Sequence, residues 1–179
     1  MTTSCKRREC SMNSSTETES NKQTSEFQKN LDILRQVTFF SGLDLEPLKV
    51  FAYLATRERL KPGESLFKQG EQEGQFVYVI SGRLAAFHDD GGALVEFGPD
   101  NYFGFMALIG KSPHLFTVTA EEESIFLTIS RERFFKTLEQ FPGIGTRFLV
   151  AVSEAVGNWE RKALEKGAAG EQHVGVSLL

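Results

Sequence analysis

The stretch Phe103 to Val118 (FGFMALIGKSPHLFTV) holds the residues whose types and spacing point most directly to binding chemistry. Gly104 suits a tight turn in which the backbone comes close to a ligand. The apolar residues after it predict one short helical turn, whose free N–H groups would point at a bound anion. Pro113 then begins a returning strand. Together these three pieces predict a cradle for a small anion.

The side chains of this cradle differ from those that would hold a phosphate tightly. Phe105 directly follows Gly104, and His114 directly follows Pro113. Near pH 7 an unperturbed imidazole is mostly neutral, and it lacks the forked donor geometry of a guanidinium. Lys111 offers positive charge from the same loop. The candidate ligand-binding residues are Gly104, Phe105, Met106, Ala107, His114, Leu115 and Phe116.

The cradle resembles the phosphate-binding cassette of the cyclic-nucleotide-binding domain family, seen in catabolite activator proteins, protein-kinase regulatory subunits and gated ion channels. Four further segments resemble that family in the same order: Lys61–Glu64 (KPGE), Phe67–Glu71 (FKQGE), Val77–Arg83 (VYVISGR) and Phe97–Gly104 (FGPDNYFG). The resemblance covers roughly residues 39 to 141. It implies a double-stranded β-helix jelly roll, mainly β with flanking helices, and a cyclic nucleotide (cAMP or cGMP) as the possible ligand.

In that family a carboxylate follows the cassette glycine and binds a sugar hydroxyl, and a guanidinium follows the proline and binds the phosphate. Here those places hold Phe105 and His114. Three interpretations stay open: a barrel filled by its own apolar side chains, an altered ligand, and weak cyclic-nucleotide binding. Asp100 stands where the family usually has glycine, and an aspartate is able to take the left-handed turn.

The elements that must position the cradle follow from the periodicity of the chain. Between residues 56 and 130, short apolar runs alternate with turn signals about every eight to twelve residues, as in a jelly roll. The predicted strands include Phe76–Ile80, Leu84–Phe87 and Leu94–Phe97. Ser25 and Asp44 are predicted N-caps of two preceding helices, and Pro142 starts a helix that runs to about Lys166.

We therefore divide the chain into four parts. Residues 1–24 are Ser, Thr, Asn, Glu and Lys with almost nothing apolar, which predicts a disordered N-terminal arm. Residues 25–141 form the cyclic-nucleotide-binding-like domain with its N-terminal helices, and residues 142–166 form a C-terminal helix. A flexible tail, residues 167–179, follows.

The C-terminal helix is a second candidate functional region. Ile144, Phe148, Val152, Ala155 and Trp159 follow one another at helical spacing along a single stripe. In the family such a helix often pairs with its twin in a dimer or covers the ligand base. Phe148, Val152 and Trp159 are therefore candidate dimer or lid residues, with simple packing against the barrel as the alternative.

Composition narrows the function classes. A chain of 179 residues, 40% hydrophobic, fits one globular domain plus tails. A net charge of −4 gives no basic footprint for nucleic acid, and the thirteen residues after Lys166 leave no room for a helix-turn-helix unit. No apolar run approaches the ~18 residues of a membrane span, and the N-terminus lacks a secretory signal. We expect a cytoplasmic protein.

Catalysis and metal binding are not favoured by the residues present. Cys5 and Cys10 both precede the predicted domain, and the histidines show no zinc-type spacing. The chain has no P-loop, nucleophile elbow or HExxH motif. We therefore expect no enzymatic activity, no metal and no cofactor. The main prediction is a regulatory or sensor module that acts through a protein partner; the alternative is a ligand-free interaction or dimerisation module.

Overall fold

The predicted strand Phe76–Ile80 becomes the central strand of the structure. In the computed structural model, which describes residues 14–88, 90–91, 93–111 and 113–167, it forms β3 (Gln75–Ser81). Successive side chains of a strand point to opposite faces of the sheet. Phe76 and Tyr78 pack among the helices, whereas Val77 and Val79 pack inside the barrel. Both faces of β3 are therefore buried.

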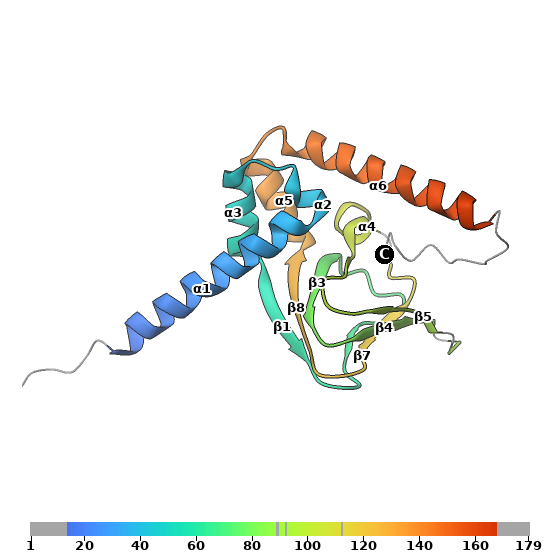
Figure 1. Ribbon diagram of the computed structural model, residues 1–179, viewed down its shortest axis with the longest axis horizontal. Coiled ribbons are helices and arrows are strands. Elements are labelled where there is room, and N and C mark those ends of the chain that lie inside the picture. The colour runs from blue at the N-terminus through green and yellow to red at the C-terminus, as the bar shows by residue number, and fades with distance from the viewer. Residues whose placement is uncertain (1–13, 89, 92, 112, 168–179) are drawn as a thin grey trace, which may run out of the picture.

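Two antiparallel sheets of four strands make up the barrel (Figure 1). The first sheet has the order β1-β8-β3-β6, and the second has the order β2-β7-β4-β5. The remaining strands are β1 (Thr56–Leu60), β2 (Ser65–Phe67), β4 (Leu84–Phe87), β5 (Ala93–Phe97), β6 (Tyr102–Phe103), β7 (Thr117–Ala120) and β8 (Ser124–Ser130). This is the predicted jelly roll with flanking helices, and the three strands predicted by residue range are confirmed within one residue at each end.

The first sheet separates two apolar cores. The barrel-side core lies between the two sheets and is rich in phenylalanine: Phe67, Phe97, Phe103, Phe116 and Phe126. The helix-side core lies on the other face of the first sheet and contains residues from all the flanking helices. These two names are used below for the two cores.

From Ser14 onward, three helices precede the barrel: α1 (Ser14–Gln36), α2 (Thr38–Ser41) and α3 (Leu45–Leu54). The apolar face of α1 buries Leu31 and Leu34 in the helix-side core. Asn30 of α1 is also buried, and its Nδ2 donates to the backbone oxygen of Ala52 at 3.3 Å. Its Oδ1 accepts from Arg57 Nε at 2.8 Å, which joins α1 and α3 to the first strand.

The N-terminus differs from the sequence prediction. Helix α1 begins at Ser14 rather than after Ser25, so the predicted disordered arm of residues 1–24 is helical over residues 14–24. Once buried turns have nucleated a helix, each residue added to its end costs little, so α1 extends into the polar residues before Ser25. Residues 1–13, with Cys5 and Cys10, lie outside the described residues.

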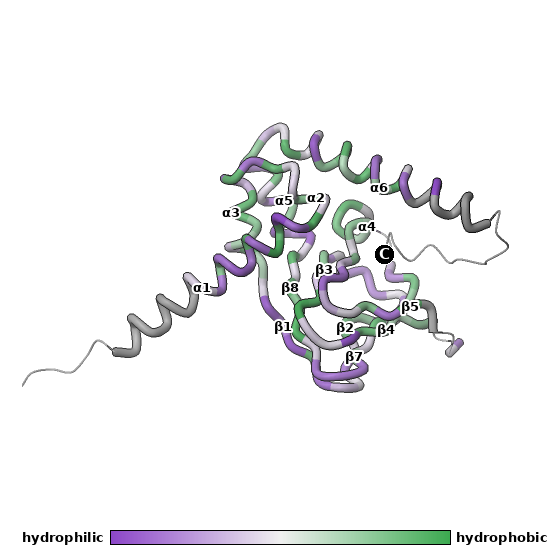
Figure 2. The backbone as a smooth tube through the Cα atoms, in the orientation of Figure 1, coloured by the Kyte–Doolittle hydropathy of each residue, from purple (hydrophilic) through white to green (hydrophobic). Residues whose placement is uncertain are grey.

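In the described part of the chain, two helices follow the last strand of the barrel, and a short one lies between β6 and β7 in the sequence. Helix α5 (Arg131–Gln140) starts at the N-cap Ser130, whose Oγ accepts from the backbone N of Arg133 at 3.4 Å. Helix α6 (Ile144–Gly167) matches the predicted C-terminal helix to within about two residues. Helix α4 (Phe105–Ile109) lies inside the cassette. Figure 2 shows that α4 is apolar along its length, in contrast to the hydrophilic strand β1.

Candidate functional site

The cassette begins at a glycine that no other residue could replace without distortion. Gly104 joins β6 to α4 with φ of 91°, in the left-handed region. A Cβ atom added there would lie 2.1 Å from the backbone oxygen of Gln75 on β3. The turn therefore requires glycine at this position for two reasons, its positive φ and the close approach of the Gln75 backbone. The first amides of α4 have no acceptor within the helix, which leaves backbone donors at this end.

The other end of α4 is held by a residue that the sequence reasoning missed. Arg131, the first residue of α5, donates from its guanidinium to the backbone oxygens of Ala107 at 3.3 Å, Ile109 at 2.9 Å and Gly110. The last carbonyls of a helix lack intrahelical donors and carry partial negative charge, so a guanidinium is a fitting cap. A cap from a distant helix leaves no signal in the local sequence.

A second contact fixes α4 from the loop before β3. Gly74 accepts from the backbone N of Arg131 at 2.8 Å. A Cβ atom on Gly74 would lie 2.1 Å from the backbone oxygen of Ala107. The loop, α4 and the start of α5 are therefore packed backbone to backbone, which fixes where the cassette stands on the barrel.

Phe105 does not lie in the barrel. Its side chain is buried in the helix-side core, and its ring centroid lies 3.6 Å from that of Phe39 and 4.7 Å from that of Phe76. The rings of Phe40 and Phe148 lie 5.8 Å and 6.0 Å away. The position that would carry a ligand-binding carboxylate therefore carries a hydrophobic anchor to the helices.

His114 is also engaged inside the protein. Its imidazole stacks on Phe67, with ring centroids 3.7 Å apart and planes 10° from parallel. Its Nε2 lies 2.6 Å from the backbone oxygen of Glu73 and donates to it, because a carbonyl oxygen only accepts. The backbone of His114 bonds the same loop, donating to Glu71 at 2.7 Å and accepting from Gly70 at 2.8 Å. This residue therefore ties the returning strand to the loop before β3.

The other candidate residues of the cassette fall into two groups. Met106 and Leu115 are exposed, 47% and 60% respectively, and Ala107 is half-buried. Phe116 is buried in the barrel-side core, where its ring centroid lies 6.1 Å from that of Phe67. The backbone of the predicted site is thus held together, but its side chains face different surroundings. Phe105 faces the helix-side core, Phe116 faces the barrel-side core, and Met106 and Leu115 face solvent.

Comparison with known proteins decides the family. The family model described as the cyclic nucleotide-binding domain matches residues 57–141. The solved structure of a cyclic nucleotide-binding-like protein from Brucella abortus is 31% identical, with a TM-score of 0.56 over 62% of this chain and 98% of that one. The chain belongs to the cyclic-nucleotide-binding domain family.

Two curated relatives show where such a domain occurs. A cGMP-dependent protein kinase of Toxoplasma gondii is 30% identical over 63% of this chain, and a cAMP-dependent protein kinase regulatory subunit of Debaryomyces hansenii is 29% identical over 60% of it. The matches span only 11% and 24% of those two proteins. The similarity therefore concerns the regulatory domain and not the whole relatives.

The turn that leads into the cassette of this cyclic-nucleotide-binding domain is held by a tyrosine. Asp100 has φ of 66°, which confirms the predicted left-handed turn. Tyr78 of β3 donates its hydroxyl to Asp100 Oδ1 at 2.7 Å. Burial, followed by this bond and the charge of Asp100, raises the pKa of Tyr78 to about 12. Asn101 Oδ1 accepts from the backbone N of Gly98 at 3.0 Å and closes the same turn.

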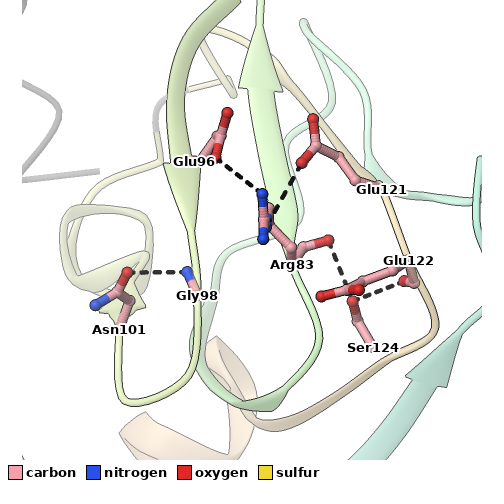
Figure 3. A network of polar contacts seen from close by, with 7 residues as sticks. All are labelled: Arg83, Glu96, Gly98, Asn101, Glu121, Glu122 and Ser124. Atoms are coloured by element: carbon pink, nitrogen blue, oxygen red, sulfur yellow. Dashed lines mark hydrogen bonds and ion pairs between the residues drawn. The ribbon is translucent and has the colours of Figure 1, made fainter.

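Beside this turn an exposed arginine bridges strand ends of the domain. Figure 3 shows Arg83 between Glu96 and Glu121, at 3.7 Å and 4.0 Å. The buried Ser124 donates to the backbone oxygens of Arg83 and Glu122, at 3.2 Å and 2.9 Å. Exposed ion pairs of this kind contribute roughly 0–1 kcal/mol. The network therefore links the start of β4 with β5 and with the turn after β7, without strongly stabilising the fold.

Helix α6 contacts the domain through the first part of its predicted stripe. Phe148 is buried, with its ring centroid 4.7 Å from that of Phe134 and 5.5 Å from that of Phe40. Val152 is half-buried, and the side chain of Trp159 lies outside the described residues. Leu149 and Val150 are exposed, 60% and 53% respectively. The predicted pairing or lid role of this helix stays a prediction.

Residues 14–88, 90–91, 93–111 and 113–167 contain no group of three or more His, Cys, Asp or Glu side chains that could hold a metal ion. Within the same residues, no helix combines the length and the apolarity that crossing a membrane requires.

Proposed function

We propose that this domain is a regulatory module whose cassette binds a cyclic nucleotide weakly, in an altered way or not at all, and whose output passes to a protein partner. The observation that carries the proposal is the use of both recognition positions for internal packing. Phe105 is an anchor in the helix-side core, and His114 is stacked on Phe67 and bonded to Glu73. We propose no catalytic role for the domain, and we propose a cytoplasmic location.

The free energy lost with the two side chains is large. A charge-assisted hydrogen bond contributes about 1.5–3 kcal/mol. Losing a guanidinium-to-phosphate bond and a carboxylate-to-hydroxyl bond therefore removes about 3–6 kcal/mol, which corresponds to roughly a hundred-fold to ten-thousand-fold weaker binding. The backbone donors at the start of α4 remain, because they depend on Gly104 and not on the side chains.

The names of the relatives support cAMP and cGMP as the ligands to test. One is a cAMP-dependent kinase regulatory subunit and another a cGMP-dependent kinase. Calorimetric titration of the full chain with each nucleotide should give an apparent Kd above about 0.1 mM, or no saturable heat. A Kd in the micromolar range for either nucleotide would show that the cassette recognises it without the two side chains, and would refute weak or absent binding.

A restoring variant sharpens the test, and the structure shows that the two positions are not equivalent. Arginine in His114→Arg is able to stack on Phe67 as the imidazole does, because the guanidinium is planar. Glutamate in Phe105→Glu would place a carboxylate among phenyl rings. We therefore expect His114→Arg to fold and to bind either nucleotide about ten-fold tighter, with His88→Arg as the matched control outside the cassette. Equal affinities of the two variants would argue against a phosphate at this loop.

A ligand-free interaction or dimerisation module is the second candidate. Adjacent exposed apolar residues on α6, Leu149 and Val150, favour it. Sedimentation equilibrium of the full chain and of Leu149→Glu would test it. A concentration-dependent dimer that the variant abolishes supports pairing through α6, and a monomer at all concentrations leaves α6 for a different protein partner.

A further inference from the structure

The cassette sends aromatic rings into the barrel from both of its ends. Phe103, which directly precedes Gly104, and Phe116, two residues after His114, are both buried in the barrel-side core. Both contact Phe67 of β2, with ring centroids 6.4 Å and 6.1 Å away. The imidazole of His114 stacks on the same ring at 3.7 Å. The interior of the barrel beside the cassette is therefore filled by rings of the protein itself.

Phe116 is held at this place by the main chain on both sides of it. The backbone N of His114 donates to the backbone oxygen of Glu71 at 2.7 Å. The residue after Phe116, Thr117, accepts through its Oγ1 from the backbone N of Gln69 at 3.0 Å. Both bonds go to the segment that links β2 to β3. The ring of Phe116, only 4% exposed, is thus fixed in the core from either side.

The rest of the barrel-side core offers a ligand apolar contact. Apart from its phenylalanines, the buried members of this core are aliphatic: Val77, Val79, Leu84, Ala86, Val118 and Ala120. Side chains of this kind pack against a flat apolar ring but make no hydrogen bonds with it. The interior therefore suits a planar ring, and the protein supplies that ring from its own chain.

We propose that Phe116 is a built-in occupant of the barrel, which excludes a planar ligand such as the purine of a cyclic nucleotide by its volume. Protein interiors are close-packed, so an added ring has to displace one that is already present. The inference rests on the proposed weak or absent nucleotide binding, and it adds a cause besides the two polar contacts. Phe116 is thus a specificity-determining residue of the cassette.

Removing the ring should open the barrel to a nucleotide. In calorimetric titration of the full chain with cAMP and with cGMP, we expect His114→Arg/Phe116→Ala to bind at least one of them about ten-fold or more tighter than His114→Arg does. Both proteins carry the same guanidinium, so the ratio of their affinities reports the removed ring. Equal affinities, or no saturable heat from either protein, would overturn the proposal.

A milder variant keeps the measurement decisive if the alanine variant does not fold. Phe116→Val removes less volume and leaves a smaller cavity. In the His114→Arg background it should bind the same nucleotide about three-fold or more tighter than His114→Arg alone. An affinity no higher than that of His114→Arg would count against Phe116 in the same way.

Indole, a flat ring without a phosphate, tests the opened volume separately from anion binding. Cavities lined by apolar side chains bind small rings of this kind. Indole at millimolar concentration should raise the Tm of Phe116→Ala by about 2 °C or more and should leave the Tm of the natural chain unchanged. An unchanged Tm in the variant would mean that no ring-sized space opens, and the proposal would fail.

Phe126→Ala is the matched control for general loosening of the barrel. Phe126 is a fully buried ring of the same core, on β8 and outside the cassette. In the His114→Arg background its removal should not tighten nucleotide binding, and a gain equal to that of Phe116→Ala would overturn the proposal. Micromolar binding by the natural chain would instead refute the proposed function, without changing the ratio between the variants.

Discussion

The barrel-side core and the helix-side core lie on opposite faces of one sheet, and each holds a different side chain of the cassette. His114 joins the barrel-side core through Phe67 and fixes the cassette to a loop of the barrel. Phe105 joins the helix-side core and fixes the cassette to α2 and α6. Two neighbouring parts of one loop are therefore held by different elements, since His114 attaches the loop to the barrel and Phe105 attaches it to the helices.

The largest expected effect comes from placing a glutamate at position 105. In Phe105→Glu a large ring is lost and a carboxylate is placed among Phe39, Phe76 and Phe148. We expect the free energy of unfolding to fall by at least about 4 kcal/mol, as measured by urea denaturation. Met106→Glu is the matched control, since Met106 is the exposed neighbour on the same helix and should cost under about 0.5 kcal/mol. A similar loss of stability in both variants would mean that a carboxylate is tolerated equally on the buried and the exposed side of α4, which would contradict the expectation.

Removing the cap of α4 should have the next largest effect. In Arg131→Lys the charge stays but the fork that reaches Ala107, Ile109 and Gly110 is lost. We expect a loss of about 1.5–3 kcal/mol in the free energy of unfolding, because a lysine ammonium cannot make all of the hydrogen bonds that the guanidinium makes to the three carbonyls. Lys136→Arg, a reverse change further along α5, serves as the control. Unchanged stability of Arg131→Lys would show that the guanidinium geometry is unimportant for the cassette.

The attachment to the barrel-side core is expected to be weaker than the attachment to the helices. His114→Ala removes the stack on Phe67 and the bond to Glu73, and should cost about 1–2 kcal/mol in urea denaturation. His114→Phe keeps the stack and loses only the bond, so its cost should be about half as large. If His114→Ala lowers the free energy of unfolding more than Phe105→Glu does, the cassette is held more strongly by the barrel-side core than by the helix-side core, and the expectation is wrong.

The smallest effect concerns Tyr78, whose side chain lies in the helix-side core while its hydroxyl holds the turn at Asp100. Tyr78→Phe should cost about 1 kcal/mol near neutral pH, because one hydrogen bond is lost and Asp100 remains exposed to water.

The same residue predicts a pH dependence. The pKa of Tyr78 is raised from 10.0 to about 12 in the folded protein, so folding disfavours the ionised form. Its contribution to stability is complete below pH 10.0, where the side chain is neutral in both states, and is lost as the pH rises to about 12. Thermal unfolding across this range should show a steeper loss in the natural sequence than in Tyr78→Phe. Identical slopes would exclude Tyr78 as the group responsible.

The sequence by itself determined the local features of this protein. The run of short strands and turns, the left-handed turn at Asp100 and the glycine at 104 depend on backbone preferences of nearby residues, and the structure has all of them. The starting point of α1 was misjudged, because propagation of a helix depends on the buried turns around Leu31 and Leu34 more than on the polar residues before them.

Only the tertiary structure decided which way the cassette side chains face. The ring of Phe105 packs with Phe39 and Phe148, and α4 is capped by Arg131, although all three partners lie far away in the sequence. Periodicity within a five-residue helix cannot specify which of its sides will meet a buried surface supplied by other elements. The sequence therefore specified Phe105 and His114 in the cassette loop, and the packing of the two cores decided what these two side chains contact.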